Sequence, residues 1–177
     1  GRTLDEYYAR QTLDGVYVGD ATGRRKAFNR VLKKMKHLSP GMGNLLDIGC
    51  GPGFFLAEAK EAGLDVFGLE ISGESVKFAK EKLRLPKIFQ DYGSLEAAAP
   101  GQFDAITAFD FIEHALDPKE VFIKANKKLK VGGLLVFTVP IINSVTAKIL
   151  GKKWNALVPT HLNYFTLKSL ENIYKPL

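Results

Sequence analysis

The sequence predicts an α/β fold in which a mostly parallel sheet carries helices on both faces. Helical and extended patterns alternate along most of the chain, the order expected of parallel strands joined by helical crossovers. A glycine-rich turn lies within "LLDIGCGPGFFL", residues 45–56, between an apolar run and the start of a helix. The length of 177 residues suits one compact domain. We therefore expect a single domain over residues 1–177, with a helical lead-in over 1–40.

The first expected helix covers residues 22–38, because its apolar residues recur on one face. They are Phe28, Val31, Leu32 and Met35. The sequence Ser-Pro-Gly at 39–41 ends this helix. A buried strand over 45–48, a helix over 54–62 and a second strand over 66–69 are expected to follow, from their short apolar runs and helical spacing.

The middle of the chain predicts a third helix, from Ser72 as its N-cap to about Leu83. Its inward residues would be Val76, Ala79 and Leu83. Two apolar runs, at 88–89 and 103–109, predict the third and fourth strands.

The pattern Asp117-Pro118 followed by Glu120 predicts a helix start, with a capping box and a proline in the first turn. The sequence Val-Gly-Gly at 131–133 is expected to end this helix. A fifth strand would then cover residues 134–139. Beyond Pro140 the pattern loosens, and the last expected helix spans 167–174.

Composition indicates an ordinary globular protein, with 46% hydrophobic and 25% charged residues. No apolar stretch is long enough to span a bilayer and no signal peptide is evident, so we expect a cytoplasmic protein. The single cysteine, Cys50, excludes a disulfide framework and a cysteine-based zinc site. The net charge of +6 would suit an anionic substrate, nucleic acid or a membrane surface. The alternative, favoured because the lysines lie mostly where helix faces would be solvated, is an ordinary soluble surface.

The glycine turn is the strongest chemical signal in the chain. Glycine at positions 49, 51 and 53 permits positive φ and lets a ligand lie against bare backbone. The amides at the start of the next helix favour a carboxylate or phosphate. Dinucleotides and S-adenosylmethionine are the two ligand classes that such a turn serves. A dinucleotide motif would place a small residue where Phe54 stands. The bulk of Phe54 therefore favours an anion smaller than a pyrophosphate, such as an amino-acid carboxylate. The alternative is that the glycines only make a turn.

Acidic residues at the next two strand ends extend this site. Glu70 stands 21 positions after Gly49 (70 − 49), where a carboxylate can accept both hydroxyls of a ribose. Asp91, in "IFQDYGSLE", could accept from an adenine amino group while Tyr92 lies against the ring. The alternatives are an exposed charge at the strand end for Glu70 and an ordinary loop residue for Asp91.

From about residue 44 to residue 165, the sequence resembles the class I S-adenosylmethionine-dependent methyltransferases, in the small-molecule branch that includes ubiquinone-biosynthesis O-methyltransferases. The resemblance rests on "LLDIGCGPG", "VFGLEIS", "IFQDYGSLE", "FDAITAFDFIEHALDP" and "LKVGGLLVFTVP". The segment "HLNYFT" at 161–166 is also similar. It implies a Rossmann-like doubly wound sheet and transfer of a methyl group to a small molecule, leaving S-adenosylhomocysteine.

The resemblance also implies roles for individual residues. The methionine part of the cofactor would be surrounded by Asp47, Gly49, Cys50, Gly51 and Gly53. Glu70 would hold the ribose, with Ile71 beside the adenine. Asp91 and Tyr92 would bind or flank the adenine, and Phe109 would contact the cofactor through its main chain. An arginine of the N-terminal helix region, Arg24 or Arg25, would also contact the cofactor, as in some members of the family.

Methyl transfer needs positioning of an in-line attack and, for a hydroxyl acceptor, a base. His114 and His161 are the candidate catalytic residues, since both lie in segments expected at the acceptor side. Their alternative role is to hold the loops together, together with Glu113. No metal is expected. Trp154 and Tyr164 would line the acceptor pocket or belong to the core.

The chain departs from the family at its end, where no strand pattern follows Tyr174. The C-terminal β-hairpin of the family would then be missing, and the fifth strand would be an unprotected edge that invites self-association. The chain is therefore expected to be short or truncated.

Substrate class is constrained mainly by absences. The segment "AFDFIE" lacks the proline-aromatic motif of enzymes that methylate base amines, and no aromatic platform accompanies the helix lysines, which argues against nucleic acid. A small molecule with an oxygen acceptor is favoured. The two alternatives are an NAD(P)-dependent oxidoreductase and a non-catalytic, partner-binding domain that keeps the fold.

Overall fold

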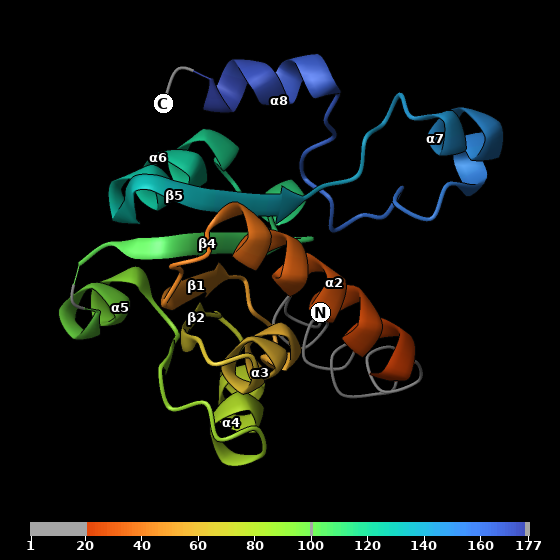
Figure 1. Cartoon of the computed structure of the whole chain (residues 1–177). Helices are drawn as coiled ribbons and strands as arrows, with labels where there is room; N and C mark the ends of the chain where they lie inside the picture. The colour runs from red at the N-terminus through yellow and green to blue at the C-terminus, as the bar shows by residue number, and fades with distance from the viewer. Residues whose placement is uncertain (1–20, 100, 176–177) are drawn as a thin grey trace.

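Five parallel strands form one sheet in the computed structural model, which describes residues 21–99 and 101–175, without the side chains of residues 21 and 22 (Figure 1). The strands are β1 (Asn44–Ile48), β2 (Asp65–Leu69), β3 (Ile88–Phe89), β4 (Phe103–Phe109) and β5 (Leu129–Thr138). Their order is β3-β2-β1-β4-β5. The predicted α/β sheet is confirmed, while residues 1–20 of the expected lead-in lie outside the described part.

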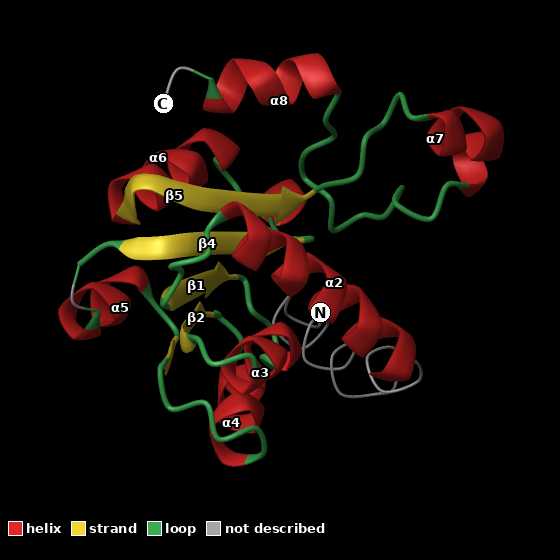
Figure 2. Ribbon diagram, in the orientation of Figure 1, coloured by secondary structure: helices red, strands yellow, loops and turns green. Residues whose placement is uncertain are grey.

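Helices cover both faces of the sheet, as Figure 2 shows. On one face lie α2 (Ala21–Leu38), α3 (Phe54–Glu61) and α4 (Gly73–Glu81), and on the other α5 (Tyr92–Ala98), α6 (Pro118–Lys128) and α8 (Leu167–Tyr174). Alternate strand residues feed the two cores: Leu45 packs on the first face and Leu46 on the second. The sheet therefore separates two apolar cores.

The chain changes direction between β1 and β4. It runs outward from β1 through β2 to β3 and then returns to pair β4 with the other side of β1. Ligands of open α/β sheets bind outside the carboxyl ends of the strands at such a switch point. The glycine turn after β1 and the loop after β4 are placed there together.

Five helix starts are fixed by side-chain N-caps. The caps are Ser72, Asp91, Asp117, Ser144 and Thr166, each accepting a hydrogen bond from a backbone amide three residues on. Three of these helices start where the sequence predicts: those capped by Ser72 and Asp117, and α8, which covers the predicted residues 167–174. The predicted capping box at Asp117 is only half formed, because the Glu120 side chain pairs with Lys124 instead (2.9 Å).

The boundary between α6 and β5 differs from the prediction. We expected the helix to end at the glycines 131–133, but α6 ends at Lys128 and β5 begins at Leu129. Leu129 pairs with Phe103, and the register then shifts before the regular pairing of Ala105 with Leu134. Gly132 has φ +78, so it serves an irregularity in the strand and does not cap the helix.

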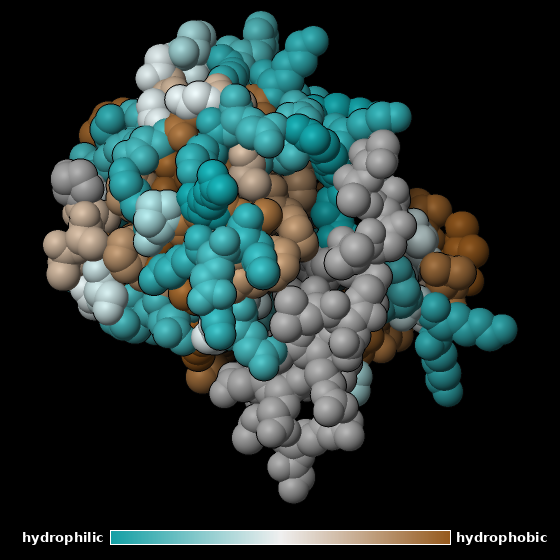
Figure 3. All heavy atoms as spheres, turned by 90° about the horizontal axis from the view of Figure 1, so that it is seen from below, coloured by the Kyte–Doolittle hydropathy of each residue, from teal (hydrophilic) through white to brown (hydrophobic). Residues whose placement is uncertain are grey.

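Two helices were not predicted. One is α5, and the other is α7 (Val145–Leu150), which with η2 (Gly151–Lys153) stands away from the sheet. Figure 3 shows a hydrophobic patch on the side of the molecule that carries α7, where Val145 and Ile149 are exposed. None of the described helices is long and apolar enough to cross a membrane.

Candidate functional site

The turn after β1 has the backbone conformation that the sequence predicts. Gly49, Gly51 and Gly53 have φ of +71°, +52° and +84°. The amide of Gly49 donates to the carbonyl of Leu69 at the end of β2 (2.8 Å). The turn is thereby tied to the neighbouring strand and ends at the first residue of α3.

The three glycines meet different surroundings, which corrects the expectation that all three present bare backbone to a ligand. A Cβ at Gly51 would meet no atom of the described residues within 4 Å, so this position is open within that part of the chain. A Cβ at Gly49 would collide with the ring of Phe111, and one at Gly53 would lie 2.7 Å from Leu85 Cδ1. Gly49 and Gly53 thus permit close packing, and Gly51 is the open position.

Glu70 lies across the turn and faces it. Its two carboxylate oxygens accept hydrogen bonds from the backbone amides of Gly51 (Oε2, 2.9 Å) and Ser72 (Oε1, 2.8 Å). Each carboxylate oxygen can accept a second hydrogen bond. The side chain is therefore positioned beside the open glycine with capacity to accept from two further hydroxyls.

Asp47 and Cys50 are buried beneath the turn. Asp47 accepts a hydrogen bond from the hydroxyl of Thr107 in β4 (2.6 Å). Burial raises the pKa of Asp47 to about 7, despite that hydrogen bond, and the charge of Glu70 adds to the rise. The Sγ of Cys50 points under β2, 2.6 Å from where a Cβ of Gly68 would lie. Burial also raises the pKa of the Cys50 thiol, so Cys50 packs inward and its side chain does not line the turn.

The residues expected around the adenine follow β2 and β3, and Phe109, expected to contact the cofactor through its main chain, lies at the end of β4. Ile71 is 75% exposed. Asp91 caps α5 through the amide (2.7 Å) and hydroxyl (2.6 Å) of Ser94, and these hydrogen bonds lower its pKa. Phe109 ends β4, where its ring packs edge-on against Phe55 (4.8 Å between centroids), which leaves its main chain at the sheet edge.

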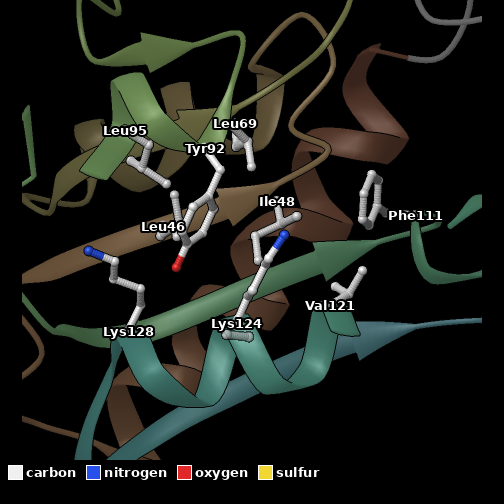
Figure 4. Close-up of a pocket in the computed structure, with 10 residues that line it drawn as sticks. Leu46, Ile48, Leu69, Tyr92, Leu95, Phe111, Val121, Lys124 and Lys128 are labelled. Atoms are coloured by element: carbon white, nitrogen blue, oxygen red, sulfur yellow. The ribbon is translucent and has the colours of Figure 1, made fainter. Parts of the chain in front are cut away.

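An apolar cavity of about 170 Å³ opens between α5, α6 and the end of β1 (Figure 4). Tyr92 and Phe111 stand in its wall together with Ile48 and Leu69. Lys124 reaches over the Tyr92 ring, with Nζ 5.3 Å from its centroid. Phe111 was not among the predicted site residues, although its position just after the fourth strand, where ligands of such sheets bind, pointed to a place in the site.

His114 and His161 come together although 47 positions separate them (161 − 114). Their rings meet edge to face, with centroids 4.8 Å apart. His114 belongs to η1 (Ile112–His114), and its Nδ1 lies 2.8 Å from the carbonyl oxygen of Thr160. The two predicted catalytic residues are therefore brought into one cluster.

The segment that carries His161 is fastened to η1 by hydrogen bonds. The carbonyl of Glu113 accepts from the amides of Leu162 (2.9 Å) and Asn163 (3.0 Å). The side-chain amide of Asn163 donates to the carbonyl of Ala115 (2.6 Å). The loop-anchoring role left open for His114 and Glu113 agrees with these hydrogen bonds, and their catalytic role stays a prediction.

Glu113 also contributes a buried carboxyl group to this cluster. Its side chain is 1% exposed, and burial raises its pKa to about 7, with a contribution from Asp110. The pKa of His161 is lowered, first by burial and then by the neighbouring His114. One donor atom from each of Glu113, His114 and His161 lies within 4.8 Å of the others.

Of the three other candidates, Arg25 and Trp154 stand outside the cluster and the turn, whereas the ring of Tyr164 lies beside His161, with centroids 6.1 Å apart. Arg25 pairs with Glu58 and Glu61 of α3 (2.9 and 2.6 Å), so its charge is used in joining two helices. Trp154 is buried, and the hydroxyl of Tyr164 donates to the carbonyl of Val158 (3.3 Å). The core role left open for Trp154 agrees with this burial.

Comparison with known protein families decides what this arrangement belongs to. A family described as a methyltransferase domain matches residues 21–175. The chain belongs to this methyltransferase family. The predicted class I fold and the cofactor class, S-adenosylmethionine, are those of the family.

Relatives of this methyltransferase domain agree with the assignment. It is 30% identical over 107 residues to a ubiquinone biosynthesis O-methyltransferase from Methylococcus capsulatus, covering 58% of this chain and 45% of the relative. A protein of the same name from Chromobacterium violaceum is 31% identical over 108 residues, covering 58% and 47%. The chain thus spans about half the length of the curated relatives it matches.

Solved structures show the same fold. A SAM-dependent methyltransferase from Archaeoglobus fulgidus superposes with a TM-score of 0.69 at 23% identity, covering 97% of this chain and 72% of that one. A sugar N-methyltransferase from a Streptoalloteichus species gives 0.56 at 26% identity, covering 80% and 55%. The sheet and its flanking helices are therefore those of other methyltransferases.

The methyltransferase domain offers S-adenosylmethionine a site that fits in part without rearrangement. Gly51 leaves open space, and Glu70 has acceptor capacity beside it. Phe111, in contrast, covers Gly49. The stretch of backbone that is open to a ligand is thus shorter than the three glycines alone suggest.

Proposed function

We propose that this chain transfers a methyl group from S-adenosylmethionine to an oxygen atom of a small-molecule acceptor, using one cofactor-binding domain. The observation that carries the proposal is the pairing of the open Gly51 with Glu70, whose carboxylate lies over the turn and accepts the Gly51 amide. A carboxylate at the end of β2 suits the two hydroxyls of a ribose. The family assignment supports the methyl donor.

The residues divide the cofactor between them. Gly51 would meet the amino-acid end, because the open backbone of the turn is there. Glu70 would accept from the ribose hydroxyls. Ile71 and Tyr92 would flank the adenine, since they follow the neighbouring strands β2 and β3, and Phe109, at the end of β4, would contact the cofactor through its main chain. Asp47 would support the site from beneath the turn without contacting the cofactor, because it is buried and interacts electrostatically with Glu70.

Bound S-adenosylmethionine supplies an electrophilic methyl group on its sulfonium. The residues of the chain then have to orient the acceptor and take its proton. His114 suits the second task. A carbonyl oxygen only accepts hydrogen bonds, so Nδ1 of His114 carries the hydrogen toward Thr160 and the lone pair of the neutral ring is on Nε2. His161 packs on this ring and shields it.

An oxygen acceptor is favoured by two considerations. The ubiquinone biosynthesis relatives are O-methyltransferases by name. A hydroxyl also needs a base, which the histidine cluster can provide, whereas a neutral amine can attack without one. A sugar N-methyltransferase among the similar structures makes nitrogen the competing acceptor.

A labelled-methyl assay tests the proposal. The chain would be incubated with S-adenosylmethionine carrying a labelled methyl group and a panel of phenols, catechols, sugars and primary amines. We expect label transfer to hydroxyl compounds with formation of S-adenosylhomocysteine. His114→Gln should lower that rate by about 10²–10⁴-fold, as expected for loss of a general base.

The exposed His37→Gln is the matched control and should leave the rate unchanged. Transfer to amines alone, undiminished in His114→Gln, would show that oxygen and the histidine base are wrong.

A further inference from the structure

Two polar side-chain atoms in the histidine cluster lack a hydrogen-bond partner among the residues that the structure describes. They are Oε2 of Glu113 and Nδ1 of His161, and both are buried. Buried polar atoms are nearly always paired, because an unmade hydrogen bond leaves the loss of hydration of the atom uncompensated. Glu113, His114 and His161 each bring one oxygen or nitrogen atom within 4.8 Å of the others, so the two unpaired atoms belong to one cluster and each is a candidate partner for the other.

The neighbouring hydrogen bonds fit this pairing. The backbone of Glu113 is held by the amides of Leu162 and Asn163, so the two segments cannot drift apart. His161 is bonded to the backbone of Ala156, in a way that favours its protonated form. His114 is committed to Thr160 through Nδ1. The segments are thus already held together, and rotation of the Glu113 and His161 side chains would complete the pair.

We propose that Glu113 and His161 form a hydrogen-bonded pair that shares one proton, which makes Glu113 a positioning residue for the histidine base of the proposed methyl transfer. The proposal rests on the proposed function for its role, although the pair itself does not require it.

Charge in the cluster supports a shared proton. Burial raises the pKa of Glu113 and lowers that of His161, so the affinities of the two groups for a proton approach each other. The charged or titratable groups that act on the pair are Asp110, whose carboxylate accepts from Thr138 (2.8 Å), and His114. The phenol ring of Tyr164 also lies beside His161, with centroids 6.1 Å apart. A pair with one proton is neutral overall, which is the least costly state for buried groups.

The pair would assist the reaction without touching the methyl group. The hydroxyl proton of the acceptor moves to Nε2 of His114, its oxygen bonds to the methyl carbon, and the carbon–sulfur bond breaks with its electrons left on sulfur. His114 is then a cation beside His161. The shared proton then lies on Glu113, so His161 stays neutral and the two rings do not repel each other.

Nitrogen-15 NMR of the histidine rings, followed through a pH titration of the whole chain, tests the pair directly. The chain has three histidines, and the exposed His37 provides an internal reference. Glu113→Gln preserves shape but cannot ionise. It should lower the titration midpoint of His161 by at least about one pH unit, because the protonated ring loses its partner. Glu120→Gln, an exposed glutamate of α6, should leave His161 unchanged.

An unchanged His161 midpoint in Glu113→Gln would overturn the pair. So would a shift of both ring signals on adding Zn²⁺ to the original chain that is lost in Glu113→Gln, since the cluster would then be a cation site. If Glu113→Gln does not fold, carbon-13 titration of the carboxyl groups gives the same answer from the other side: His161→Gln should raise the midpoint of Glu113.

These measurements need neither cofactor nor acceptor. Failure of the chain to bind S-adenosylmethionine would contradict the proposed function but not the Glu113–His161 pair. A His161 that titrates without a partner would contradict the pair but not the proposed function.

Discussion

The residues of the turn after β1 show how far a sequence motif specifies contacts. The motif correctly predicts positive φ at all three glycines, because that is a local property of the chain. It could not predict which glycine stays open. Phe111 reaches Gly49 from the loop after β4, and Leu85 reaches Gly53 from beyond α4. Both are tertiary contacts with no local signal at the turn.

Substitution of the glycines should separate packing from ligand binding. Gly53→Ala should lower the free energy of unfolding by about 1–3 kcal/mol, because its Cβ would press on Leu85 at a positive φ. Gly51→Ala meets open space, so it should cost only about 1–2 kcal/mol of backbone strain. Urea denaturation measures both.

Isothermal calorimetry then compares S-adenosylhomocysteine binding by the two variants where both are folded. We expect Gly51→Ala to weaken binding more than Gly53→Ala. Weaker binding by Gly53→Ala than by Gly51→Ala would show that Gly51 is not the position at which the ligand meets the backbone.

Asp47 should make stability depend on pH. Its pKa is raised from 3.8 to about 7 in the folded chain, so folding favours the protonated form. The stabilisation is complete below the unfolded pKa and is lost as pH rises through about 7. Asp47→Asn can keep the hydrogen bond from Thr107 but cannot ionise. Its free energy of unfolding should therefore rise relative to that of the original chain, by about 2 kcal/mol between pH 5 and pH 8.

Urea denaturation of the two proteins at both pH values checks this. Glu113 contributes in the same direction in both proteins, so it cancels in the difference. A difference that does not change with pH would mean that Asp47 is ionised in the folded chain.

At the scale of elements, helix starts were easier to predict than helix ends. The caps at Ser72 and Asp117 act on amides three residues away, so a short pattern contains the whole interaction. The end of α6 depends instead on Leu129 pairing with Phe103 in β4, a contact between distant segments. Asp91 shows the same limit: its place suggested a ligand contact, and its side chain starts α5.

The edge of the sheet predicts an association property. Within the described residues, β5 pairs with β4 on one side, and no strand pairs with its other side. An unpaired edge is a template for another chain. We expect the 177-residue chain to form dimers or larger species as its concentration rises, measured by light scattering after size exclusion. A single monomeric species at all concentrations, with a cooperative melt at high temperature, would contradict this.

At the scale of the whole molecule, strand order explains why residues far apart in sequence meet. The return from β3 to β4 places the loop after β4 next to the turn after β1, and the segment after α7 then covers η1. The turn, Glu70 and both histidines could be singled out from the sequence because their segments carry recognisable patterns. The contact between the two histidine rings could not be predicted, since 47 positions and four further elements, α6, β5, α7 and η2, lie between them.

The central claim is that the strand ends around Gly51 and Glu70 bind an adenosyl amino acid, and calorimetric titration tests it most directly. The chain would be titrated with S-adenosylmethionine, with S-adenosylhomocysteine and, for comparison, with a reduced nicotinamide dinucleotide. We predict micromolar binding of both adenosyl ligands, at least about tenfold weaker in Glu70→Ala, as expected for loss of hydrogen bonds to a charged group, and unchanged in the exposed control Glu74→Ala. A folded chain that gives no heat with either adenosyl ligand, or that binds only the nicotinamide, would contradict the account.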